Sequence, residues 1–290
     1  MAYQQTRSIL KQQGLAPKKK LGQNFLVHRH TAQRIVDLAE LAKDDSVIEV
    51  GVGLGALTRP LAKTAGKVIG LETDSGIIRM HQQQGDLPEN VTLIHEDVLK
   101  INFSELLRYS EHKLKLVANL PYSISSPFLF RLIDHCDIID SAVVMVQKEV
   151  ALRLLAEPGT KEYGVPTVML ASCADVKPLL EVKPAEFHPR PKVDSMVIRI
   201  SFNPLPARVK ALGNFDRKLL KNVVNGAFGQ RRKTLLNALS ATGLIPDKQI
   251  LRECIAGAGI APTIRAEKLF LEDFITLTNS IQHCLDSTVQ

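Results

Sequence analysis

The stretch Ser46–Gly55, which reads SVIEVGVGLG, decides the fold of this 290-residue chain. Five residues typical of a buried strand run directly into three glycines, and a helical pattern over residues 56–64 follows at once. Glycines between a strand and a helix let the backbone turn tightly and let a ligand lie against the main chain. The stretch therefore predicts a strand, a ligand-binding turn and a helix, with Gly51 and Gly53 close to the ligand.

The same alternation of strand and helix continues on both sides of this stretch. The strand candidates are rich in Val, Ile and Leu without clean polar alternation, which is typical of parallel strands buried on both faces. We therefore predict an α/β fold with a doubly wound, mostly parallel seven-stranded sheet, similar to the Rossmann fold. The predicted strands are Ser46–Val50, Lys67–Leu71, Val91–His95, Leu114–Ala118, Ser141–Val146, Ala174–Val182 and Val193–Phe202, and helices are expected at Thr31–Ala42, Ala56–Thr64, Thr73–Gln82, Phe103–Tyr109 and Pro127–His135.

The segment Asn203–Pro206 reads as a linker, because its two prolines disfavour both a continued strand and a helix start. Beyond it the apolar residues recur with a helical period, and helices are expected near residues 215–228, 234–241, 247–258 and 266–285. The sequence predicts a first domain over residues 1–204, which includes a basic N-terminal arm, and a small helical domain over residues 205–290.

The net charge of +7 is unevenly distributed. Residues 1–30 carry +6, residues 31–204 carry −4, and residues 205–290 carry +5. Basic ends around a mildly acidic middle suit a polyanionic partner, because each neutralised phosphate releases counterions. Many soluble proteins are modestly basic, so charge alone leaves nucleic-acid binding open.

Several classes of protein and site are excluded by composition. No apolar run approaches the roughly 18 residues of a membrane span, and residues 1–30 contain no apolar core of a signal peptide. The cysteines at 136, 173, 254 and 284 are far apart, and His28 and His30 have no third ligand nearby, so we expect neither a disulfide framework nor a metal site. A reducing compartment, most simply the cytoplasm, fits this pattern.

Acidic residues follow or close three successive strands of the predicted sheet. Glu49 precedes the glycines, in an order that suits a cationic or zwitterionic ligand better than a pyrophosphate. Glu72 closes the second strand, where a carboxylate can accept both ribose hydroxyls, and Asp97 follows the third strand, where it can accept from an adenine amino group. An adenosine-containing ligand with a charged tail satisfies all three, and S-adenosylmethionine is such a ligand.

The tetrapeptide Asn119–Tyr122, which reads NLPY, follows the fourth strand. It resembles the signature of methyltransferases that modify an exocyclic amino group. The amino nitrogen of adenine is a poor nucleophile, because its lone pair is delocalised into the ring. The side-chain oxygen of Asn119 and the carbonyl of Pro121 can hold its hydrogens and aim the lone pair at the methyl group, while Tyr122 stacks on the base.

Five ordered blocks make the resemblance more specific. They are residues 21–26, 119–122, 147–150, 187–195 and 228–235. Together they resemble the KsgA/RsmA family, the small-subunit (16S) rRNA adenine dimethyltransferases, over about residues 7–283. The chain departs from the usual pattern at Val52, where the glycine loop commonly has proline, and at Ser123, where asparagine commonly follows the tyrosine.

The resemblance implies a role for each matching residue. Catalysis would involve Asn119, Pro121, Tyr122 and Phe187, the last stacking on the target base opposite Tyr122. The cofactor S-adenosyl-L-methionine would be bound by Asn24, Leu26, Gly51, Gly53, Glu72, Asp97 and Asn119. The implied substrate is two adjacent adenosines in the 3′-terminal hairpin loop of the small-subunit rRNA, each methylated twice, within an immature small ribosomal subunit.

Two basic runs are candidates for contacts with RNA phosphates. Lys18, Lys19 and Lys20, together with Lys11, are expected to form a mobile basic arm. Arg231, Arg232 and Lys233 lie at a helix junction in the C-terminal domain, which is expected to bind rRNA. Nothing in the sequence demands more than a monomer.

Three other functions stay open at this point. A dimethylase of large-subunit rRNA would share the glycine loop and the tetrapeptide. A ribosome-assembly or transcription factor with little turnover would share the basic ends. A DNA adenine methyltransferase is disfavoured, because 86 C-terminal residues leave little room for a target-recognition domain.

Overall fold

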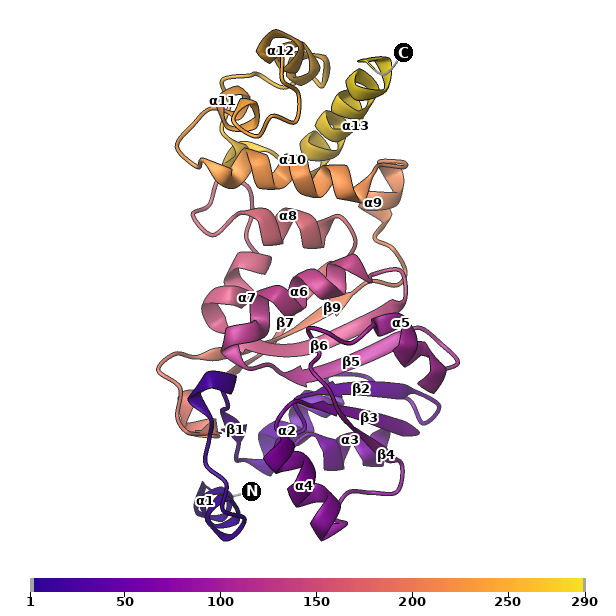
Figure 1. Ribbon diagram of the computed structural model, residues 1–290, viewed down its shortest axis with the longest axis vertical. Helices are drawn as coiled ribbons and strands as arrows, with labels where there is room; N and C mark the ends of the chain where they lie inside the picture. Colours follow the sequence, from indigo (N-terminus) through magenta and orange to yellow (C-terminus); the bar gives the residue numbers. More distant parts are fainter. Residues whose placement is uncertain (1–2, 289–290) are drawn as a thin grey trace. The chain divides into compact units, whose positions relative to one another are not determined.

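The computed structural model describes residues 3–288, which fall into two units (Figure 1). The first contains the residues up to Ala151 together with Ala174–Pro204, and the second contains Leu152–Cys173 and the chain from Leu205. The division at residue 204 coincides with the predicted boundary. Residues 152–173 were assigned to the first domain, but they group with the C-terminal helices, because helix α8 (Val165–Ala171) packs against α10 (Arg217–Gly229).

The first unit contains a seven-stranded sheet, as the alternating pattern predicted. The strand order is β4-β3-β2-β5-β6-β9-β7. Strands β2 to β6 are parallel, while β9 runs antiparallel between β6 and β7, inside the sheet rather than at its edge. The bounds are β2 Ser46–Val50, β3 Lys67–Glu72, β4 Val91–His95, β5 Leu114–Asn119, β6 Ile139–Gln147, β7 Asp175–Val182 and β9 Ser195–Ser201.

Helices precede and connect these strands, five of them near the predicted places, while the helix after β6 was not predicted. They are α2 Arg29–Asp37, α3 Thr58–Thr64, α4 Ser75–Gln84, α5 Phe103–Leu106, α6 Ser125–Asp134 and α7 Lys148–Leu154, with short 3₁₀ turns at Leu107–Tyr109 and Tyr122–Ile124. A small two-stranded sheet pairs β1 (Phe25–Leu26) with β8 (Phe187–His188). It ties the segment that precedes α2 to the segment that precedes β9.

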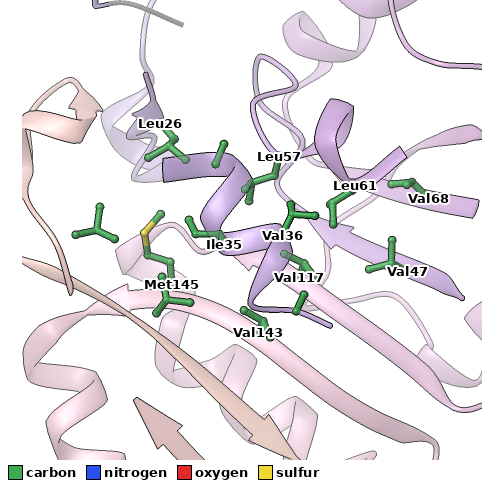
Figure 2. Close-up of a cluster of buried hydrophobic side chains, with 14 of the residues drawn as sticks. Leu26, Ile35, Val36, Val47, Leu57, Leu61, Val68, Val117, Val143 and Met145 are labelled. Carbon is green, nitrogen blue, oxygen red and sulfur yellow. The ribbon is translucent and has the colours of Figure 1, made fainter. Parts of the chain in front are cut away.

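The apolar face of α2 packs over the sheet with α3 (Figure 2). Ile35 and Val36 of α2, together with Leu61 of α3, are completely buried. They contact strand residues that include Val47 and Val117 in one cluster. This packing anchors the strand whose carboxyl end runs into the glycine turn.

Truncating Leu61 to alanine is expected to lower the free energy of unfolding by about 2–5 kcal/mol, because it removes apolar burial and leaves a cavity. Urea unfolding of the first unit would show this as a lower midpoint. Val193, whose side chain is 45% exposed, is the matched control, and Val193→Ala should change the midpoint little. Equal midpoints for Leu61→Ala and the unaltered protein would contradict the packing.

The second unit is helical. Its helices are α8, α9 Ala207–Ala211, α10, α11 Leu235–Ser240, α12 Lys248–Gly257 and α13 Leu271–Thr288. The expectation of no disulfide is wrong at one pair, because Cys254 of α12 and Cys284 of α13 form a disulfide. The two cysteines are 30 residues apart in sequence, and they meet because α12 and α13 pack against each other. Cysteine spacing along the chain carries no information about such packing.

Candidate active site

The carboxyl ends of β2, β3, β4 and β5 surround one cavity in the first unit. Parallel strands end at the same edge of a sheet, so residues far apart in sequence meet there. The structure brings all of the predicted cofactor-binding residues to the wall of this cavity: Asn24, Leu26, Gly51, Gly53, Glu72, Asp97 and Asn119.

The glycine loop adopts a backbone shape that other residues tolerate poorly. Gly51 has φ +81° and Gly53 has φ +53°, both in the left-handed region. A Cβ atom on Gly53 would also lie 3.2 Å from the ring of Phe25. The N–H of Gly53 donates to Glu72 Oε2 at 3.0 Å, which ties the loop to the end of β3.

The two carboxylates predicted to bind adenosine are held by backbone donors. Glu72 is 6% exposed, and its Oε1 accepts from the N–H of Asp74 at 2.8 Å. Burial raises the pKa of Glu72 above its usual value, although these backbone hydrogen bonds oppose the rise. Asp97 is half-buried and accepts from the N–H of Leu99 at 2.9 Å through Oδ1. Both side chains are thereby oriented before a ligand arrives.

Glu49 is a polar residue of this cavity whose burial the sequence did not reveal. It lines the cavity wall, is completely buried, and neither of its carboxylate oxygens has a hydrogen-bond partner among the described residues. Burial raises the pKa of Glu49 to about 8. A buried acid without partners favours a nearby positive charge, so the cavity fits a ligand that carries an ammonium and a sulfonium group.

Asn119 ends β5 with its amide in a defined orientation. Its Nδ2 donates to the carbonyl oxygen of Asn24 at 3.1 Å. Asn24 in turn donates from its own Nδ2 to the carbonyl of Gly22 at 3.1 Å. Since the amide nitrogen of Asn119 is directed to Asn24, its Oδ1 is left as the acceptor for a substrate.

The carbonyl of Pro121 is less available than the sequence suggested. It accepts from the N–H of Ile124 at 3.0 Å and from Ser125 Oγ at 3.4 Å, within the turn that starts α6. A carbonyl oxygen has two lone pairs, so these two donors occupy it. The carbonyl of Leu120, another residue of the cavity wall, takes no part in this turn.

Tyr122 is held in place by its hydroxyl group. The phenol oxygen lies 2.7 Å from Oγ of Ser195, at the start of β9. Burial raises the pKa of Tyr122, although the hydrogen bond with Ser195 opposes the rise. The ring is therefore held by the backbone at one end and by this hydroxyl contact at the other, which suits a surface on which a base stacks.

Phe187 lies in the core of the first unit. Its side chain is only 1% exposed and belongs to the buried cluster that includes Leu26 and Ile35. Its strand β8 pairs with β1, with Phe187 opposite Leu26. Stacking of Phe187 on the target base stays a prediction, and it would require the ring to become accessible to that base.

Around the N-terminal lysines the structure shows a helix and a hydrogen bond, and their role as a mobile basic arm stays a prediction. Residues Tyr3–Gln12 form helix α1, and Lys18 Nζ donates to Asp74 at 2.6 Å. Burial alone would raise the pKa of Asp74, but the hydrogen bonds from Lys18 and Gln23 outweigh this effect and hold the pKa below its usual range. Lys20 is exposed and lines the mouth of the cavity; the side chain of Lys19 lies outside the described residues.

The second basic run lies in the helical unit, between α10 and α11. Arg231 is partly engaged, because its guanidinium donates to the carbonyls of Lys161 and Tyr163 and lies 3.7 Å from Glu267. Arg232 and Lys233 are exposed. The phosphate-binding role predicted for all three is therefore most accessible to the last two.

Within residues 3–288, no three metal-ligating side chains form a group that could hold a metal ion. In the same range no helix is both long and apolar enough to cross a membrane.

The chain is similar to known proteins along almost its whole length. Residues 14–283 match a family model described as Ribosomal RNA adenine dimethylase. The chain is 50% identical to Ribosomal RNA small subunit methyltransferase A of Desulfotalea psychrophila, covering 99% of both proteins. It is 41% identical to the protein of the same name from Geobacter metallireducens, covering 93% of this chain and 97% of that relative.

Solved structures agree on the fold. A dimethyladenosine transferase from Plasmodium falciparum matches with a TM-score of 0.69 and 25% identity, covering 89% of this chain and 98% of that one. The 23S rRNA methyltransferase ErmE matches with a TM-score of 0.62 and 24% identity, covering 89% of this chain and 100% of that one, which concerns the fold alone. From its whole-length matches, the chain belongs to the ribosomal RNA adenine dimethylase family, which consists of S-adenosylmethionine-dependent methyltransferases.

Proposed function

We propose that this protein dimethylates the exocyclic amino groups of two adjacent adenosines in the 3′-terminal hairpin loop of small-subunit (16S) rRNA. The observation that carries the proposal is the fixed amide of Asn119 at the wall of the cavity. The names of the relatives at 50% and 41% identity support the small ribosomal subunit as the source of the substrate.

The cavity residues hold the donor in this proposal. Glu72 accepts the ribose hydroxyls and Asp97 accepts the adenine amino group, while the backbone at Gly51 and Gly53 lies against the amino-acid tail. Bound S-adenosylmethionine supplies an electrophilic methyl group on a sulfonium. The buried carboxyl of Glu49 lies in the same wall, where its charged form stabilises positive charge.

The target amine is held by two acceptors. Oδ1 of Asn119 and the carbonyl of Leu120 each accept one of its hydrogens, which turns the nitrogen lone pair toward the methyl group. The rate gain comes from positioning and electrostatics rather than from a strong base. In each transfer an N–C bond forms as the S–CH3 bond breaks, S-adenosylhomocysteine leaves, and the nitrogen releases one proton to water. After one transfer the amine therefore keeps one hydrogen, so one acceptor suffices to orient it for the second. Tyr122 stacks on the base in both rounds.

The RNA substrate suits this arrangement. Bases in a hairpin loop are already unpaired, so moving one into a pocket costs little. We assign the helical unit to rRNA binding, with Arg232 and Lys233 on phosphates, and Lys20 to the RNA near the cavity mouth. In this proposal the protein acts on an immature small subunit, as a monomer, in the cytoplasm where subunits assemble.

Replacing Arg232 and Lys233 by serine should weaken RNA binding and flatten its salt dependence. For single-stranded RNA, log affinity falls with log salt, and each phosphate that is no longer neutralised reduces the steepness of this fall by about 0.7. The double variant should therefore reduce it by about 1.4. Filter binding between low and physiological salt measures the slope. Lys210 and Lys248, also exposed in the helical unit, give a control with the same charge change, and a slope equal to that of the unaltered protein would remove the assignment.

A methylation assay tests the whole function. Purified protein, radiolabelled S-adenosylmethionine and immature small subunits should give label, and primer extension should stop at two adjacent adenosines of the 3′-terminal loop. Stops in large-subunit rRNA instead would favour a large-subunit dimethylase. No label on either RNA, with binding intact, would favour an assembly factor with little turnover.

A further inference from the structure

Three consecutive carbonyl groups of the glycine loop are held by two side chains outside the cavity wall. His81 Nε2 lies 2.8 Å from the carbonyl oxygen of Gly53. Arg59 Nη1 donates to the carbonyls of Leu54 and Gly55 at 3.0 and 3.2 Å. These contacts add to that of Glu72, which accepts the Gly53 N–H.

The carboxylate of Asp86 contacts both His81 and Arg59. Asp86 lies after α4, and its Oδ1 is 2.8 Å from His81 Nδ1 while its Oδ2 accepts from Arg59. Arg59 comes from α3, His81 from α4 and Asp86 from the turn toward β4, so three elements meet at the loop. We call Arg59, His81 and Asp86 the loop clasp.

The contacts of His81 fix the orientation of its ring. One ring nitrogen lies against a backbone carbonyl, and the other lies against a carboxylate that also binds a guanidinium. The His81 side chain is 1% exposed, so these two contacts hold a ring that is buried from water.

The glycine loop depends on contacts to define its shape. Residues Gly51–Gly55 contain three glycines and no proline, and glycine loses the most backbone freedom on ordering. The N–H groups of its three glycines already have hydrogen-bond acceptors. The contacts from His81 and Arg59 engage three consecutive carbonyls as well, so the clasp completes the hydrogen bonding of the loop.

We propose that the loop clasp holds the glycine loop in its donor-binding shape, and that His81 is a positioning residue for S-adenosylmethionine affinity. The inference rests on the proposed donor site. One ring nitrogen of His81 contacts the carbonyl of Gly53 while Asp86 holds the other, so removing the ring would free one carbonyl of the loop.

Calorimetry with S-adenosylmethionine tests the clasp. His81→Leu should raise the donor Kd by about 10- to 100-fold, which is the range expected for lost hydrogen bonds to a charged group, with kcat at saturating donor nearly unchanged. His81→Gln keeps an N–H for the carbonyl of Gly53, so it should restore most of the affinity.

His135→Leu is the matched control, because His135 also bonds a backbone carbonyl in the first unit, that of Arg131, away from the cavity wall. It should leave the donor Kd unchanged. A folded His81→Leu protein with unchanged donor Kd would overturn the clasp. If the unaltered protein itself binds no donor, the proposed function fails instead.

Discussion

Replacing Asn119 by alanine should lower kcat for methyl transfer by about 10²- to 10³-fold, the range measured when one donor or acceptor that stabilises a transition state is removed. The alanine lacks the Oδ1 that holds an amine hydrogen, and it also releases the carbonyl of Asn24. Single-turnover methylation of immature small subunits with labelled donor measures the rate of the chemical step.

Two further variants sharpen this result. Asn119→Asp keeps an acceptor but loses the N–H that bonds Asn24, so its rate should fall between those of the alanine variant and the unaltered protein. Asn237→Ala changes an exposed asparagine of α11 and should leave the rate unchanged. Undiminished turnover by Asn119→Ala would eliminate the two-acceptor mechanism.

Truncating Glu72 to alanine should raise the Kd for S-adenosylmethionine by about 100-fold or more. The protein would lose the two hydrogen bonds that we propose the carboxylate accepts from the ribose, each in the range of about 1.5–3 kcal/mol for a charged partner. Its loss would also free the N–H of Gly53, which it accepts at 3.0 Å, so the glycine loop would lose an anchor. Calorimetric titration of donor into the protein measures the change.

Glu89→Ala is the matched control, since Glu89 is an exposed acid in the segment between α4 and β4. Its donor Kd should equal that of the unaltered protein. A Glu72→Ala protein that binds donor as tightly as the control would show that the ribose lies elsewhere. Glu72→Gln, which keeps one acceptor oxygen, should give an intermediate Kd.

Strands and turns were the features most accessible from the sequence. The predicted strand Ser46–Val50 and the observed β2 have the same bounds, and Val91–His95 matches β4 in the same way. These strands were visible because a run of branched apolar residues, followed by glycine or an acid, is a local signal. Helix α1 was missed, since its residues are mostly polar and carry no long apolar stripe.

The candidate site was predictable to the extent that strand ends reveal it. Glu72, Asp97 and Asn119 each follow or close a parallel strand, so topology alone places them together. Topology does not predict whether a nearby side chain reaches the cavity or lies in the core. Phe187 is an aromatic residue beside two prolines in sequence, yet its pairing with Leu26 directs it into the core.

The sequence by itself determined the order of strands and helices, the glycine loop and the acids and amide at the strand ends, because each depends on a few neighbouring residues. Only the tertiary structure decided that Glu49 is buried without partners, that Cys254 meets Cys284, and that His81 reaches Gly53. Such contacts join residues about 30 positions apart or depend on what covers a side chain. They follow from how helices pack on the sheet and on each other, which no local pattern of residues specifies.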